Sequence, residues 1–180
     1  MRVIAGQARR TALAAPKGQS TRPTADRIKE SLFNIIASYV PDARFLDLFC
    51  GSGAIGIEAL SRGASGAVFV DISQDAVGVT RANLARVRFE ERALVLQMCA
   101  VEAISRLGRE GRSFDVIFMD PPYGKGLLGP VFDVLEESPI LAAGGIVVAE
   151  IAADEPLPVA ESLGRYDERV YGSTRLVFFK

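Results

Sequence analysis

The sequence contains no histidine and only two cysteines among its 180 residues. Without histidine the chain cannot form a Ser-His-Asp triad or use imidazole as a general base, and it lacks the commonest zinc ligand. Cys50 and Cys99 lie in apolar runs without metal-type spacing. This pattern favours free thiols in a reducing compartment over a disulfide scaffold. We therefore expect a cytoplasmic protein without a bound metal.

Long hydrophobic runs are also absent. No stretch reaches the ~18 consecutive apolar residues that a membrane-spanning helix needs, and the N-terminus has no hydrophobic signal core. The sequence therefore predicts neither membrane insertion nor export. At 49% hydrophobic content the chain can still bury one substantial core. We expect a monomer with a main domain at residues 44–180 and a small N-terminal extension at residues 1–43.

Charge is nearly balanced overall but unevenly distributed. The formal net charge is −1, yet residues 1–44 carry eight Lys/Arg against three Asp/Glu, and the remainder carries thirteen against nineteen. This asymmetry favours a basic N-terminal arm that meets an anionic partner. On charge alone, an ordinary solvated surface is the alternative interpretation.

The most informative stretch is FLDLFCGSGAIG at residues 45–56. It has the pattern of a short buried strand, a glycine-rich turn and the start of a helix, with Gly51, Gly53 and Gly56 in G-x-G-x-x-G spacing. Asp71 ends the next expected strand, 20 positions after Gly51. A carboxylate there can accept hydrogen bonds from two ribose hydroxyls. The two features predict an adenosine-type ligand, with NAD, S-adenosylmethionine or a plain strand-to-helix turn all still open.

Strand and helix patterns alternate along the main domain. Strands are expected at 45–49, 67–71, 94–96, 114–119 and 145–150, helices at 55–61, 74–88, 100–107, 127–137 and 157–163, and a closing antiparallel pair at 166–171 and 175–179. This alternation predicts an α/β fold: a mostly parallel, seven-stranded sheet with helices on both faces and an antiparallel closure.

The N-terminal extension has a simpler pattern. Residues 2–5 and 9–11 are expected to face each other in a hairpin around Gly6. Thr24 is the candidate N-cap of an amphipathic helix that continues to Tyr39 and ends at Pro41.

A second motif, Asp120-Pro121-Pro122-Tyr123, follows the fourth expected strand. Its loop therefore opens at the same carboxyl edge of the sheet as the glycine-rich turn. Consecutive prolines keep the backbone extended and leave their carbonyls free to face a ligand. The Asp120 carboxylate and a fixed carbonyl form an acceptor pair suited to an exocyclic amino group, and Tyr123 offers a ring on which a base can stack.

These motifs together resemble a known family. DPPY after a fourth strand, with FLDLFCGSGAIG and FVD upstream, resembles the class I S-adenosylmethionine-dependent methyltransferases that act on amino groups. RVIAGQARR, STRPTADRIKESLFNII and the closing YGSTRLVFF resemble the RsmD family, which methylates guanine N2 in bacterial small-subunit ribosomal RNA. The resemblance covers nearly the whole chain. It implies a Rossmann-like class I methyltransferase fold, S-adenosylmethionine as cofactor, and ribosomal RNA or a small-subunit ribosomal particle as partner.

The resemblance also implies roles for individual positions. Those expected to hold the methionine part of the cofactor are Asp47, Cys50, Gly51, Ser52, Gly53 and Gly56. Asp71 is expected to hold the ribose, with Ile72 against the adenine. Cys99 and Ala100 stand where related enzymes often have an acid near the adenine amino group.

The remaining implied roles concern the RNA. Guanine is expected to be received by Asp120, Pro121, Pro122 and Tyr123, and RNA phosphates to be contacted by Arg9, Arg10, Arg22 and Arg27 of the basic arm. An adenine-N6 methyltransferase acting on DNA or RNA would use the same acceptor pair and is an alternative. A non-catalytic RNA-binding assembly factor is another, although the intact DPPY motif disfavours it. An NAD oxidoreductase is disfavoured because a double-proline loop has no use in hydride transfer.

Overall fold

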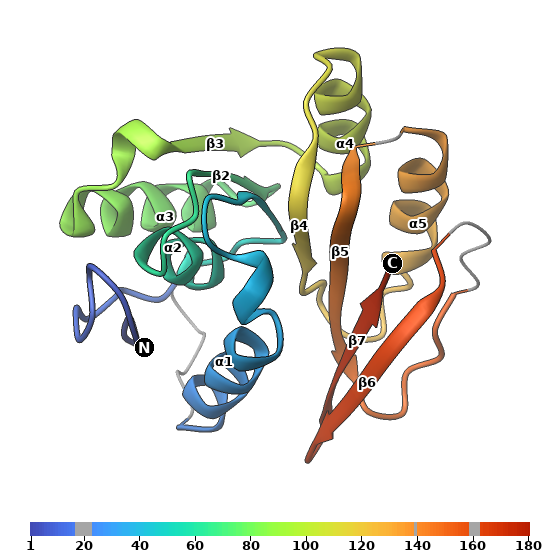
Figure 1. Cartoon of the computed structure of the whole chain (residues 1–180), viewed down its shortest axis with the longest axis horizontal. Helices are drawn as coiled ribbons and strands as arrows, with labels where there is room; N and C mark the ends of the chain where they lie inside the picture. Colours follow the sequence, from blue (N-terminus) through green and yellow to red (C-terminus); the bar gives the residue numbers. More distant parts are fainter. Residues whose placement is uncertain (17–22, 139, 159–162) are drawn as a thin grey trace.

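In a computed structural model, which describes residues 1–16, 23–138, 140–158 and 163–180, the chain folds around a single sheet (Figure 1). Its elements are α1 (Pro23–Ile35), η1 (Ala37–Tyr39), β1 (Arg44–Leu48), α2 (Ala54–Ser61), β2 (Gly66–Asp71), α3 (Gln74–Val87), η2 (Glu90–Arg92), β3 (Ala93–Gln97), α4 (Ala100–Arg109), β4 (Phe114–Met119), α5 (Leu128–Glu137), β5 (Leu141–Ala152), β6 (Arg165–Tyr171) and β7 (Thr174–Phe179), where η marks a short 3-10 helix.

The seven strands lie in the order β3-β2-β1-β4-β5-β7-β6. β1 pairs in parallel with β2 and β4, and β4 pairs in parallel with β5. β7 runs antiparallel to both β5 and β6. The expected α/β fold with an antiparallel closure is confirmed. Strand order reverses between β1 and β4, and in open α/β sheets this switch point is where ligands bind, beyond the carboxyl ends of the strands.

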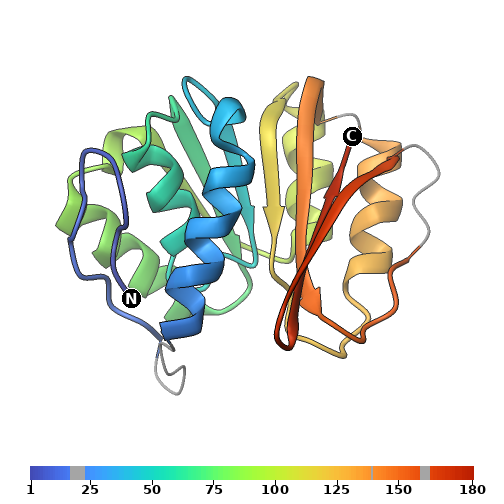
Figure 2. The same ribbon diagram turned by 60° about the horizontal axis from the view of Figure 1, so that its bottom comes forward.

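Side chains alternate between two buried layers because successive residues of a strand point to opposite faces. Phe45 and Phe69 belong to the layer covered by α1, α2 and α3, whereas Leu46 and Val68 belong to the layer covered by α4 and α5. Figure 2 shows the two groups of helices on opposite sides of the sheet. The central strands are buried on both faces, which explains their nearly continuous apolar sequences.

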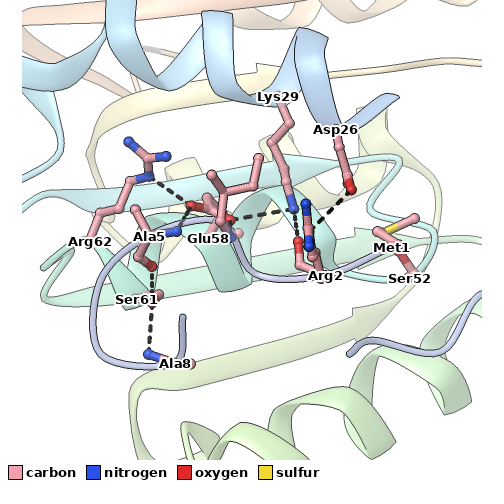
Figure 3. Close-up of polar contacts among 12 residues, drawn as sticks. Met1, Arg2, Ala5, Ala8, Asp26, Lys29, Ser52, Glu58, Ser61 and Arg62 are labelled. Atoms are coloured by element: carbon pink, nitrogen blue, oxygen red, sulfur yellow. Dashed lines mark hydrogen bonds and ion pairs between the residues drawn. The ribbon is translucent and has the colours of Figure 1, made fainter. Parts of the chain in front are cut away.

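The N-terminal segment forms the expected hairpin: Arg2 and Ala12 form an antiparallel bridge, the Val3 N–H donates to the Thr11 carbonyl at 3.0 Å, and the Arg10 N–H donates to the Val3 carbonyl at 2.9 Å. A regular ladder does not form because the backbone N–H groups of Ile4 and Ala5 donate to the Glu58 carboxylate of α2, at 2.8 and 2.9 Å. Lys29 of α1 lies 3.4 Å from the same carboxylate (Figure 3). A buried acid thus joins three segments and limits the pairing of the expected hairpin to the part around Val3.

The boundaries of two other elements differ from expectation. α1 ends at Ile35 instead of continuing to Tyr39, because the chain tightens into a 3-10 turn ahead of Pro41, which has no N–H to donate. β5 begins at Leu141, four residues before its expected start at Gly145, with an irregular register before Ile146.

Some expectations fall on residues that the structure does not describe. The helix at 157–163 lies largely outside the described residues, and its flanking residues 157–158 and 163 are not helical. The Thr24 side chain, the candidate N-cap, also lies outside the described side chains.

The extension at residues 1–43 shares a core with the sheet. Val3, Leu13 and Phe33 are buried in the same apolar layer as Phe45 of β1. The division at residue 43 as a boundary of an RNA-binding extension stays a prediction. Within the described ranges, no helix is long and apolar enough to cross a membrane.

Candidate functional site

The glycine-rich turn connects the end of β1 to the first turn of α2. Phe49, Gly51 and Gly53 all have positive φ angles, of 62°, 55° and 74°. Gly53 is the N-cap residue of α2, and its N–H donates to the Cys50 carbonyl at 2.7 Å. The turn therefore reverses within a few residues and leaves the first N–H groups of α2 directed toward the carboxyl edge of the sheet.

The three glycines have different physical reasons to lack a side chain. A Cβ on Gly56 would lie 2.3 Å from Cε1 of Phe69, so this position allows α2 to pack closely on β2. A Cβ on Gly53 would lie 2.9 Å from the Thr80 methyl group. A Cβ on Gly51 would meet no atom within 4 Å. Gly51 is thus the glycine that faces open space, where a ligand can approach the backbone.

Two polar residues of α3 hold the turn from behind, and sequence reasoning missed both. The Thr80 hydroxyl donates to the Gly51 carbonyl at 3.0 Å, and the Asn83 amide donates to the Ser52 carbonyl at 2.9 Å. Both side chains are buried. Their signal in the sequence was available: two polar residues three positions apart on the buried face of an expected helix.

Two carboxyl groups organise the backbone of the turn. Asp47, fully buried in β1, accepts from the Gly56 N–H at 2.9 Å. Asp71 accepts from the Gly51 N–H at 2.9 Å with one oxygen and from the Ser73 N–H at 2.9 Å with the other. Each carboxylate oxygen has two lone-pair directions, so Asp71 keeps acceptor capacity beyond these two bonds.

The residues expected beside an adenine lie next to Asp71. Ile72 follows it directly and is 72% exposed, which is unusual for an isoleucine in a folded protein. The Met98 N–H donates to the Asp71 carbonyl at 3.1 Å, so the end of β3 lies at the same edge. Cys99 is half-buried and is the N-cap residue of α4, and Ala100 is buried below it. An exposed apolar surface is thus present there, without an acid at position 99.

The DPPY loop lies beside the glycine-rich turn because β1 and β4 are neighbours. Leu48 is in register with Met119, and the Asp120 N–H donates to the Leu48 carbonyl at 3.4 Å. Asp120 is exposed, Pro121 is buried and Pro122 is exposed. Within the described part of the chain, the Pro121 carbonyl has no hydrogen-bonding protein partner, so it is free to accept one from a ligand.

Tyr123 is oriented by two residues that sequence reasoning missed. Its hydroxyl donates to Glu150 of β5 at 3.4 Å and lies 3.3 Å from the Thr174 hydroxyl of β7. The Tyr123 side chain remains 44% exposed, so part of its ring is open to a ligand. Glu150 could have been found, because it ends its expected strand as Asp71 and Asp120 end theirs. Thr174 lies in the YGSTR stretch, whose contact with the loop depends on the antiparallel closure.

The site gathers carboxyl groups whose charges oppose ionisation. Burial raises the pKa of Asp47 to about 7, against the effect of its bond to Gly56. Burial likewise raises the pKa of Glu150 to about 7. Desolvation by the surrounding protein raises the pKa of Asp120, and the carboxylates of Glu150 and Asp47 raise it further, although the Asp120 side chain reaches solvent at the edge of the site. Such an arrangement is suited to a cationic ligand, which would favour the ionised carboxylates.

The arginines expected to contact RNA lie on separate elements. Arg9 and Arg10 are exposed in the N-terminal segment, and Arg27 is exposed on α1. Arg22 lies outside the described residues. Their contacts with a nucleic acid stay a prediction.

Replacing two of the glycines by alanine should separate folding from ligand binding. Gly56→Ala introduces an overlap with Phe69, and we expect the free energy of unfolding to fall by about 1–3 kcal/mol. In Gly51→Ala the free energy of unfolding should fall only by the cost of an alanine in the left-handed conformation, about 1–2 kcal/mol. This variant should nevertheless weaken the binding of an adenosine-type ligand at least as much as Gly56→Ala does. Urea unfolding and calorimetric titration measure the two effects. Full ligand affinity in Gly51→Ala would show that the open side of Gly51 is not a binding surface.

Comparison with known proteins identifies the family. Residues 1–180 match the family model described as "Conserved hypothetical protein 95". The Bacillus subtilis protein YlbH is 38% identical over 181 residues, covering 100% of this chain and 98% of its own length. "Ribosomal RNA small subunit methyltransferase D" of Escherichia coli is 35% identical over 173 residues, covering 96% of this chain and 85% of its own length. The solved structure of yhhF from Escherichia coli is 33% identical and superposes with a TM-score of 0.88, covering 99% of this chain and 96% of its own. The chain therefore belongs to the RsmD family, within the Rossmann-like class I methyltransferases.

Proposed function

We propose that the chain transfers a methyl group from S-adenosylmethionine to the exocyclic N2 of a guanine in small-subunit ribosomal RNA. The observation that carries the proposal is the contact between the Asp120 N–H and the Leu48 carbonyl. It places the DPPY loop and the glycine-rich turn side by side at the carboxyl edge, so a cofactor on one and an amino group on the other would be neighbours. The name of the Escherichia coli relative, "Ribosomal RNA small subunit methyltransferase D", supports methyl transfer to small-subunit ribosomal RNA.

The residues present fit this cofactor. Gly51 leaves the backbone open, Asp71 retains acceptor capacity for ribose hydroxyls, and Ile72 offers an exposed apolar surface for adenine. S-adenosylmethionine supplies a methyl group on a positively charged sulfur. The carboxyl groups of Asp47 and Glu150, with pKa values raised to about 7, are suited to a nearby positive charge.

The DPPY loop supplies the chemistry at the base. In the proposed arrangement the Asp120 carboxylate and the Pro121 carbonyl accept the two N–H bonds of the guanine amino group. The nitrogen can then pyramidalise and direct its lone pair at the methyl carbon. The nitrogen would bond to the methyl carbon as the S–C bond breaks, and S-adenosylhomocysteine with a neutral sulfur would be left. Asp120 would then take the proton that the positively charged nitrogen has to lose. The rate gain comes from positioning and from a carboxylate aimed at the developing charge.

The environment of Tyr123 supports a stacking role for its ring. Hydrogen bonds between the Tyr123 hydroxyl and the side chains of Glu150 and Thr174 hold the ring in place relative to β5 and β7. A base stacked on an aromatic ring gains roughly 1–3 kcal/mol. Because a paired base cannot reach such a pocket, the target guanine must lie in a loop or leave its helix.

The test is incubation of the protein with labelled S-adenosylmethionine and small-subunit ribosomal RNA or particles that lack the modification, followed by nucleoside analysis. We expect labelled N2-methylguanosine. Labelled N6-methyladenosine would replace the proposal with an adenine methyltransferase. An absence of transfer to both naked RNA and particles, with intact cofactor binding, would favour an RNA-binding assembly factor.

Asp120→Ala should separate catalysis from cofactor binding. Loss of the carboxylate aimed at the amino group should lower kcat by about 10²–10³-fold, while the Kd for S-adenosylmethionine changes less than about tenfold. Single-turnover methyl transfer and calorimetric titration measure the two quantities. Equal loss of both would contradict this assignment of Asp120.

Cofactor binding should release protons near neutral pH. Asp47 and Glu150, each with a pKa near 7, are about half protonated at pH 7 in the free protein, and a bound cation lowers both pKa values. We expect a release on the order of 0.5 proton per group at pH 7, and an affinity that rises from pH 6 to pH 7.5. Calorimetry in buffers of different ionisation enthalpy measures the release. S-adenosylhomocysteine, whose sulfur is neutral, should release fewer protons. Heats independent of the buffer would contradict the expectation.

A further inference from the structure

The arginines of this protein fall into two groups. Eight are paired with an acid: Arg2, Arg44, Arg62, Arg106, Arg112, Arg165, Arg169 and Arg175 each lie within 4.0 Å of a carboxylate oxygen. Arg27 on α1 and Arg109 on α4 are exposed and have no acidic partner among the described residues. Five further exposed arginines without an acidic partner among those residues gather on two segments, the N-terminal segment and α3 with its C-cap. They are Arg9, Arg10, Arg81, Arg86 and Arg88. We call the surface that they form the basic flank.

The two segments of the basic flank are fastened to each other. Asn83 of α3 donates to the Ala14 carbonyl at 2.9 Å and accepts from the Ala14 N–H at 2.8 Å. Arg86 donates to the Ala12 carbonyl at 3.3 Å. Both ribbon views show the N-terminal segment lying against α2 and α3 (Figures 1 and 2). The two segments that carry the arginines are therefore held side by side, although Arg10 and Arg81 are 71 positions apart in the sequence.

Basic residues outnumber acidic ones on the two segments of the basic flank. Residues 1–16 contain three arginines and no acid, and residues 74–88 contain three arginines and one acid, Asp75. Glu90 and Glu91 of η2 lie just beyond its end. Among the described residues none of the five arginines has an acidic partner, and Arg86 uses only one N–H on the Ala12 carbonyl. Their remaining guanidinium N–H groups are therefore available to an external anion. Guanidinium groups are well suited to phosphate, which they bind through two parallel hydrogen bonds.

The composition of the flank favours nucleic acid over a protein partner. Large exposed hydrophobic side chains among the described residues are Ile72, Tyr123, Leu127, Tyr166 and Val170, and none belongs to residues 1–16 or 74–88. Protein interfaces usually depend on buried aromatic or aliphatic anchors at their centre. A surface of unpaired arginines without such anchors is instead typical of contact with a phosphate backbone.

The flank extends away from the candidate site. α3 begins at Gln74, three residues after Asp71, and its 14 residues span about 21 Å. Arg81 lies about halfway along, and Arg86 and Arg88 lie at the far end. We propose that the basic flank binds the phosphate backbone of the substrate RNA beyond the target nucleotide, with Arg81, Arg86 and Arg88 of α3 as contacts. This inference rests on the proposed function and adds a second RNA-binding surface to it.

The test is the salt dependence of RNA binding by the full-length protein. The probe is a fluorescent fragment of small-subunit ribosomal RNA that the wild-type protein binds. In Arg81→Gln/Arg86→Gln/Arg88→Gln, the slope of log affinity against log salt should be about 2 smaller in magnitude than in wild type, since each lost phosphate contact contributes roughly 0.7–0.9. The Kd and the KM for RNA should rise about 10–100-fold, with kcat at saturating RNA and the cofactor Kd unchanged.

A matched control removes the same charge elsewhere. Arg109→Gln/Arg165→Gln/Arg169→Gln changes exposed arginines on α4 and β6, and it should leave the salt slope as in wild type. An equal loss in both triple variants would show an effect of net charge alone and overturn the proposal, as would an unchanged slope in the α3 variant. Should the loss of the Arg86–Ala12 contact impair folding, Arg81→Gln/Arg88→Gln leaves that contact intact and should show about two thirds of the slope change.

The outcomes distinguish this inference from the proposed function. Formation of N2-methylguanosine with equal salt slopes in wild type and the α3 variant would overturn the flank and leave the function standing. Conversely, a steep slope that depends on the α3 arginines, without any N2-methylguanosine, would retain the binding surface and remove the proposed reaction.

Discussion

Parallel pairing of β1 with β4 is the constraint on which the candidate site depends. These strands are far apart in the sequence, but their register places Leu48 beside Met119, so the segments that follow them begin at the same edge. A hydrogen bond from the Asp120 N–H to the Leu48 carbonyl joins the start of the DPPY loop to the end of β1, just before the glycine-rich turn. Any chemistry that needs both loops requires this register, because a slip of one residue would direct every side chain of a strand to the opposite face.

The site gathers several carboxyl groups in surroundings that disfavour their ionised form. Asp47 is buried beside the turn, and burial together with the Glu150 carboxylate opposes the ionisation of Asp120. Burial of such groups costs free energy in the absence of a positive charge. The cost is understandable where a cationic ligand binds, because the same groups then become favourable partners. The electrostatics of the protein alone thus agree with a sulfonium cofactor.

Support of the two loops comes from side chains of α3, β5 and β7. Thr80 and Asn83 of α3 hold the carbonyls of the glycine-rich turn, while Glu150 and Thr174 hold the hydroxyl of Tyr123. Asn83 also binds Ala14, so the helix that supports the turn fixes the N-terminal segment as well. Glu58 performs a similar task on α2, where it binds the backbone of the same segment. The basic flank and the candidate site therefore belong to one connected framework.

The sequence by itself determined the local features: the glycine-rich turn, the alternation of strands and helices, and the loop of Asp120 to Tyr123. These follow from short-range rules such as the freedom of glycine, the restriction of proline and hydrophobic periodicity. Only the tertiary structure decided how distant residues meet. The pairing of Glu150 and Thr174 with Tyr123, the capture of the Ile4 and Ala5 N–H groups by Glu58, and the alignment of α3 with the N-terminal segment all depend on strand order and helix packing. Such contacts join residues tens of positions apart, and no local pattern encodes them.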